Sequence, residues 1–160
     1  MTGNSKTLWV ISLSAVLAMA LLPVSSAFAA GAHCNPGTLK GQYLVSASGW
    51  VFPPAFGVTA PAISAAAAYS FYNGDGTGED HVTFTVDGVV VVPATIEPFV
   101  YTLNSDCTGT RTVSPSDTPP GPHFNIYVAS DGSGLTEIAT DPGFSVTSFD
   151  KRVGQSQNSQ

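Results

Sequence analysis

The stretch Asn73-Gly-Asp-Gly-Thr-Gly-Glu-Asp-His-Val-Thr-Phe-Thr-Val86 decides the fold of this chain. Its first six residues are typical of a tight turn, because glycine tolerates positive φ and the side chains of Asn, Asp and Thr form hydrogen bonds with the nearby backbone. From His81 onward polar and apolar residues alternate strictly, which places Val82, Phe84 and Val86 on one face of a strand. The stretch therefore predicts a tight turn that leads directly into a β-strand.

A strand that follows such a turn needs a partner before it. We therefore predict a strand from about Ala66 to Tyr72, which follows a loop from Phe56 to Ser64. The alternative for residues 65–68 is a short alanine-rich helix that starts at Pro61, since alanine favours helix and proline is tolerated in a first helical turn. The hairpin favours the strand.

The rest of the chain repeats the pattern of short strands and tight turns, rich in Val and Thr and poor in Lys and Glu. Further strands are predicted at Gly41–Val51, Val89–Val92, Thr95–Asn104 with an interruption near Pro98, Thr110–Val113, Phe124–Ala129, Leu135–Thr140 and Phe144–Asp150. The proline-rich segment Ser114–Pro122 is predicted to be an exposed loop. The short strands and turns leave no segment long enough for a long amphipathic helix.

This pattern predicts an all-β fold: a single antiparallel up-and-down barrel of about eight strands. A two-sheet β-sandwich is the alternative. Closure is favoured because an open sheet would leave uncharged edges such as Val89–Val92 free to aggregate. A barrel of this size either fills its interior with side chains or holds one small ligand, and the sequence does not choose between the two.

The first 29 residues form a predicted secretory signal peptide, with Lys6 before an apolar stretch and the small residues Ala27 and Ala29 at the cleavage site. Residues 30–153 are the predicted barrel domain, and residues 154–160 a frayed polar tail. We expect a secreted or periplasmic protein.

Cys34 and Cys107 are the only cysteines of the chain. Export to an oxidising compartment allows them to persist as a disulfide bond. The bond would close a loop of about seventy residues and tie the mature N-terminus to the turn that contains Cys107.

The mature chain would carry four basic side chains against eleven acidic ones, a net charge of −7. Such an acidic balance disfavours nucleic acid and anionic membrane surfaces as partners. We expect no membrane association after the signal peptide is removed.

Four pieces of the chain resemble those of a known group of proteins: Gly41-x-Tyr43, Asn73–Gly78, Tyr101–Gly109 and Thr140–Gly143. They look like small exported bacterial proteins whose fold is similar to the calycin and allene-oxide-cyclase-type barrels. The motifs are turn and disulfide motifs, so the resemblance implies a fold and brings no catalytic residues with it.

No motif predicts a metal, a cofactor or a catalytic set. The turn Asn73–Gly78 spaces oxygen ligands as a calcium loop does, but Phe84 stands where such a loop needs a bidentate Glu. Glu79 and His81 share a strand face and form a candidate carboxylate-oriented base, although such a pair more often decorates a solvated rim. The three histidines lack metal-ligand spacing. We expect no nucleotide cofactor, metal site or serine triad.

Residues spread over several strands would form an apolar pocket with polar handles if they face inward. The candidates are Tyr43, Trp50, Phe84, Tyr101, Arg111 and Phe124. Ordinary packing is the equal alternative for the aromatic residues. For Arg111 an outward position is favoured, because an inward one requires an acid such as Glu97 or an anionic ligand group as a partner.

The leading hypothesis is an exported barrel that binds a small, mostly apolar molecule without catalysis. One alternative is a barrel enzyme of cyclase or isomerase type, in which Glu97 or His81 supplies the acid or base. The other is a structural surface scaffold with a packed interior. An interior cavity would favour binding or catalysis over the scaffold.

Overall fold

The computed structural model describes residues 33–114 and 116–153. The predicted signal peptide and polar tail lie outside the described residues. The strands are β1 (Gly41–Val51), β2 (Ala62–Tyr72), β3 (Thr77–Val86), β4 (Val89–Leu103), β5 (Thr108–Val113), β6 (His123–Val128), β7 (Gly134–Ala139) and β8 (Phe144–Arg152), with short 3-10 helices η1 (Pro36–Thr38) and η2 (Ala55–Gly57). No helix of the described part is long and apolar enough to cross a membrane.

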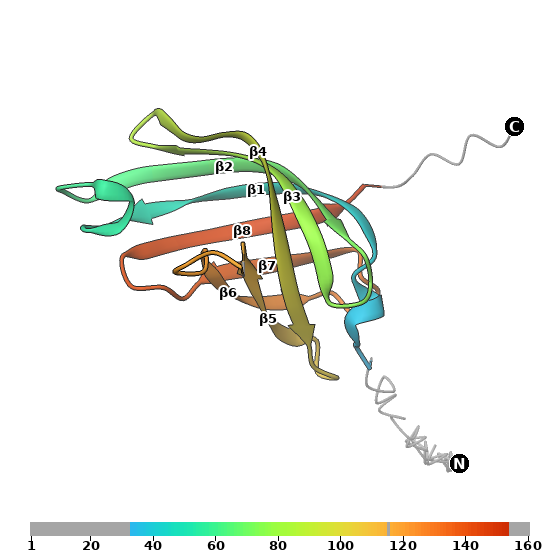
Figure 1. Ribbon diagram of the computed structural model, residues 1–160. Coiled ribbons are helices and arrows are strands. Elements are labelled where there is room, and N and C mark those ends of the chain that lie inside the picture. Colours follow the sequence, from blue (N-terminus) through green and yellow to red (C-terminus); the bar gives the residue numbers. More distant parts are fainter. Residues whose placement is uncertain (1–32, 115, 154–160) are drawn as a thin grey trace, which may run out of the picture.

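The eight strands close into one antiparallel barrel in which each strand pairs with its neighbours in the chain (Figure 1). Closure is made by β1 and β8, whose ladder runs from Tyr43 opposite Arg152 to Val51 opposite Phe144. The predicted up-and-down barrel is therefore confirmed, and the sandwich alternative is wrong.

The turn before β3 folds as its side chains predict. The Asp75 carboxylate accepts hydrogen bonds from the backbone N–H of Thr77 at 3.0 Å and from its hydroxyl at 2.7 Å. These hydrogen bonds lower the pKa of Asp75. Asp106 and Thr108 repeat the arrangement in the turn between β4 and β5. The Asp75 carboxylate thus stabilises the turn in which it lies.

Two predicted boundaries are wrong. β2 begins at Ala62, so neither the long loop nor the alanine-rich helix forms, because pairing along all of β1 outweighs the helix propensity of alanine. β4 continues through Pro98 without interruption. That proline sits opposite Glu79 on one side, and on the other its carbonyl accepts a hydrogen bond from Ser114 N–H at 2.7 Å.

Closure does not cover the valine-rich part of β4. This strand pairs with β5 only from Phe99 to Leu103, so among the described strands Val89–Pro98 has a ladder with β3 alone. Val89 remains 64% exposed. The expectation that a closed barrel would hide this edge is therefore wrong, since β4 is much longer than β5 and extends past it (Figure 1).

The barrel end beside η1 is closed by an apolar cluster and the disulfide. Cys34 and Cys107 are bonded, with their Cα atoms 5.0 Å apart, so this prediction is confirmed. The Tyr101 hydroxyl donates to the carbonyl of Pro36 at 2.8 Å and lies 3.1 Å from that of Leu39, which seats the N-terminal segment under the strands. The cluster consists of Cys34, Leu39, Tyr43, Tyr72, Phe99, Tyr101, Leu103, Ile126, Val128 and Leu135.

Candidate ligand-binding cavity

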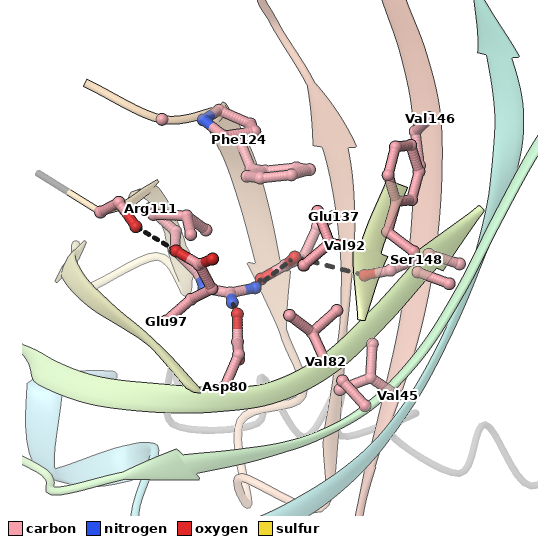
Figure 2. Close-up of a pocket in the computed structure, with 18 of the residues that line it drawn as sticks. Val45, Asp80, Val82, Val92, Glu97, Arg111, Phe124, Glu137, Val146 and Ser148 are labelled. Carbon is pink, nitrogen blue, oxygen red and sulfur yellow. Dashed lines mark hydrogen bonds and ion pairs between the residues drawn. The ribbon is translucent and has the colours of Figure 1, made fainter. Parts of the chain in front are cut away.

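A cavity of about 260 Å³ lies inside the barrel, beyond the closed end (Figure 2). Small residues make the room: Ala66 pairs with Phe84 and Ala68 with Val82 across the β2–β3 ladder, so each large side chain faces a methyl group. Most of the wall is apolar. Its apolar members are Val45, Ala47, Phe56, Ala66, Ala68, Val82, Phe84, Val92, Val113, Phe124, Phe144 and Val146.

The rim of the cavity lies where the strands of the barrel are short. β5, β6 and β7 have six residues each, against fifteen in β4. The connection between β5 and β6 contributes Asp117, Gly121 and Pro122 to the lining, and η2 contributes the half-exposed Phe56. The proline-rich loop that the sequence predicts to be exposed therefore forms part of the entrance.

A buried ion-pair network forms the inner end of the cavity. The Arg111 guanidinium, 4% exposed, donates through Nη1 to both Glu137 oxygens at 2.9 and 2.8 Å and through Nη2 to Asp80. Ser70 donates to the other Asp80 oxygen at 2.6 Å. Burial acts to lower the pKa of Arg111, but the carboxylates of Asp80 and Glu137 outweigh it and raise that pKa. Arg111 is thus a fixed internal cation.

The guanidinium also lies over aromatic rings. Its Cζ is 4.3 Å from the ring centroid of Phe99 and 5.8 Å from that of Phe124. A cation over a ring face is attracted by the ring quadrupole. Phe99 and Phe124 therefore hold the plane of Arg111 in place between its two acids.

Asp150 lies behind this network and is fully buried. One of its oxygens accepts a hydrogen bond from Ser148 at 2.9 Å, while the other has no hydrogen-bond partner among the described residues. Burial, and next the Glu137 carboxylate, raise the pKa of Asp150 to about 8, against the opposing effects of Arg111 and Ser148. The raised pKa favours the protonated form of Asp150 at neutral pH.

The raised pKa of Asp150 predicts a specific pH dependence of stability. The folded chain holds a proton that the unfolded chain releases above its ordinary pKa of 3.8, so the contribution is complete below about pH 4 and is lost as pH rises towards 8. Asp150→Asn removes the carboxyl group that binds this proton, and with it this pH-dependent contribution to stability. We expect its free energy of unfolding to fall less between pH 6 and 8 than that of the wild type, by about 1.4 kcal/mol per pH unit. Urea unfolding at several pH values measures the difference.

Asp87→Asn is the matched control, because Asp87 is exposed in the turn between β3 and β4. Its pH profile should follow that of the wild type. Equal slopes for Asp150→Asn and the wild type would show that Asp150 holds no such proton.

Glu97 extends the line of acids towards the rim. It stands directly opposite Asp80 in the β3–β4 ladder and lines the same cavity. Ser114, at the end of β5, donates a hydrogen bond to one of its oxygens. Figure 2 shows Asp80, Glu97, Arg111 and Glu137 gathered at one side of the cavity, with Phe124 and several valines around them.

The structure divides the six predicted pocket residues into three groups. Phe84, Arg111 and Phe124 line the cavity. Tyr43 and Tyr101 point inward, but they lie near η1 and therefore pack in the apolar cluster at the closed end instead of lining the cavity. Trp50 is 48% exposed, since it lies on the outward phase of β1 between the inward positions Gly49 and Val51.

Arg111 differs from its expected placement. The sequence favours an outward side chain, and the structure buries it. Glu97, which the sequence offers as its inward partner, hydrogen-bonds Ser114 instead, and Asp80 and Glu137 take the guanidinium. Glu137 comes from β7, far along the chain, so strand periodicity alone could not indicate the pairing.

The pair Glu79 and His81 stands on the outer face of β3. His81 Nε2 lies 3.1 Å from Glu79 Oε1, with half-exposed side chains. Because Asp80 between them points inward, both are turned away from the cavity. The solvated-rim interpretation is therefore the one that the geometry supports.

Sequence reasoning missed the acids Asp80, Glu137 and Asp150 as members of the site. A signal was available for Asp80, which has the same strand phase as Val82 and Phe84. Asp150 likewise shares the inward phase of Phe144, Val146 and Ser148 on β8. A charged residue on the apolar phase of a strand is the mark of a buried polar site.

No protein-family model, no curated protein and no solved structure matches this chain. The resemblance to calycin and allene-oxide-cyclase-type barrels stays a prediction that rests on the four motifs. The cavity itself is therefore the feature that indicates a function.

Proposed function

We propose that this protein is an exported β-barrel that binds one small, mostly apolar molecule in its cavity, without catalysis. The observation that carries the proposal is the cavity of about 260 Å³ with apolar walls and a small set of polar groups at one side. Ligand sites commonly combine these two features. The predicted signal peptide and the disulfide support a secreted or periplasmic location.

The size of the cavity limits the ligand. At about 30 Å³ for each molecule of liquid water, the space corresponds to roughly nine waters. A molecule of about ten non-hydrogen atoms fits, whereas long-chain lipids would extend past the rim. The cavity also argues against the scaffold alternative, for which a filled interior is expected.

The enzyme alternative has less support from the geometry. His81, one of its two candidate bases, faces away from the cavity. Asp80 and Glu137 are paired with Arg111, and Asp117 is exposed at the rim, which leaves Glu97 as the candidate acid inside the cavity. Acid–base catalysis of an isomerisation usually needs a second positioned group. Binding is therefore the better-supported function.

Native mass spectrometry of the protein purified from its own host tests the proposal. We expect a fraction of molecules to carry an additional mass that is lost on unfolding. A mass-free protein that also gives no thermal shift with a broad panel of small apolar compounds at saturating concentration would contradict it, because any ligand that binds only the folded state raises its stability.

A cavity-filling substitution tests whether the ligand binds in this cavity. Ala66 lines the cavity, so the ring in Ala66→Phe should occupy the ligand space and abolish binding. Ala67 is its outward-facing neighbour on the same strand, and Ala67→Phe is the matched control that should bind as the wild type does. Calorimetric titration with the identified ligand measures both. Binding that survives in Ala66→Phe would place the ligand elsewhere.

A further inference from the structure

The charges that line the cavity are strongly unbalanced. Of the described residues in its lining, four are carboxylates and one is a guanidinium: Asp80, Glu97, Asp117, Glu137 and Arg111. Arg111 is already shared by Asp80 and Glu137, which leaves that group of three with one excess negative charge. Any ligand that enters therefore meets a negative potential, focused by the apolar wall around it.

Glu97 places a negative charge at the wall of the cavity, where a ligand would bind. Its position directly opposite Asp80 brings two carboxylates together on one face, and Arg111, the counterion of Asp80, is already shared with Glu137. The nearby Ser114 hydroxyl supplies a hydrogen bond but no positive charge. A cation beside Glu97 would relieve the repulsion.

Aromatic rings line the same space. Phe56, Phe84, Phe124 and Phe144 all contribute to the wall, and their ring centroids lie 5.2 to 6.3 Å apart where they contact one another. Ring faces attract organic cations and also pack against apolar bodies. Phenylalanine offers no hydroxyl that an anionic head group could use.

From these observations we propose that the cavity selects an apolar amine: a compact hydrocarbon or aromatic body that carries one ammonium group. The ammonium pairs with Glu97 near the Asp80 side, and the body packs among the phenylalanines and the small residues of β2. Fatty acids and other carboxylates are excluded, because the inward cation is already neutralised by two acids. This inference rests on the proposed binding function and specifies its ligand class.

Three compounds of similar shape and different charge test the inference: phenethylamine, phenethyl alcohol and phenylacetate. Their binding to the exported, oxidised protein is measured by isothermal titration calorimetry at low ionic strength and neutral pH. We expect phenethylamine to bind most tightly, at least about tenfold tighter than the alcohol, and phenylacetate to show no binding. Ethylamine, which lacks the aromatic body, should not bind and controls for nonspecific attraction to an acidic protein.

Glu97→Gln locates the charge effect. It keeps an oxygen for the Ser114 hydroxyl and removes the carboxylate, so phenethylamine should lose about tenfold or more in affinity while phenethyl alcohol is unchanged. Glu79→Gln, on the outer face of the same hairpin, is the matched control and should change neither.

The possible outcomes separate the inference from the function it depends on. If the alcohol binds as well as the amine, or phenylacetate binds best, the amine preference is overturned while the cavity remains a binding site. An amine affinity that Glu97→Gln leaves unchanged overturns the assignment of the ammonium to Glu97. If none of the three compounds binds, the amine inference is overturned, while the binding proposal is decided separately by the native mass spectrometry and the broad compound panel.

Discussion

Arg111→Met is expected to lower the free energy of unfolding by about 3–5 kcal/mol. The guanidinium is buried between Asp80 and Glu137, and its removal leaves two buried carboxylates without their counterion. Methionine replaces much of the volume, so the loss reports the uncompensated charge more than a void. Urea unfolding at neutral pH measures the change.

The pH dependence and a compensated variant distinguish this cause from a packing defect. A buried carboxylate without a counterion binds a proton more readily when folded, so Arg111→Met should be least destabilised near pH 5 and increasingly so as pH rises. The triple variant Arg111→Met, Asp80→Asn, Glu137→Gln should recover most of the loss. Lys151→Met, at an exposed position, should be close to neutral. A deficit that does not vary with pH would point to packing instead.

Removal of the disulfide by Cys34→Ala together with Cys107→Ala is expected to cost about 4 kcal/mol. The two cysteines are 73 residues apart, and in the chain-entropy model a bond across such a separation strongly restricts the unfolded chain. The N-terminal segment would also lose its attachment, although Tyr101 still binds the carbonyl of Pro36. Chemical denaturation of the double variant, and of the reduced wild type, measures the effect.

The backbone at Cys107 provides an internal comparison. Its φ is +68°, and the equivalent position in the sister turn before β3 is Gly76, with φ +96°. Alanine is strained in this region and glycine is not. Cys34→Ala with Cys107→Gly should therefore be more stable than the double alanine variant, by about 1 kcal/mol. A loss below 1 kcal/mol for the double alanine variant would contradict the stabilising role of the bond.

The disulfide shows how much can be predicted from local evidence. Two cysteines allow a single intramolecular pairing, and the turn around Cys107 repeats the Asn-x-Asp-x-Thr pattern of residues 73–77. Both turns fold with the same Asp-to-Thr hydrogen bonds. Turn chemistry is local, because the side chain and its backbone partner are two residues apart.

The position of Arg111 shows where local evidence ends. Period-two alternation indicates that a strand has two faces, but the lone cation of β5 could be assigned to the inner face only if its partners were known. Those partners are on β3 and β7. The same holds for Tyr43 and Tyr101, whose distance from the cavity depends on how far along the barrel each residue sits. Trp50 differs, because it lies on the outward phase of β1.

The amino-acid sequence by itself determined the strands, the tight turns, the disulfide and the order in which neighbouring strands pair. These depend on side-chain alternation and on hydrogen bonds between residues close in the chain. Only the tertiary structure decided which side chains share the barrel interior. Closure brings Asp80, Glu97, Arg111 and Glu137 from four strands to one side of a cavity, and the unequal strand lengths leave that cavity open beside the β5–β6 loop. Such contacts depend on register around the whole barrel, which no single segment encodes.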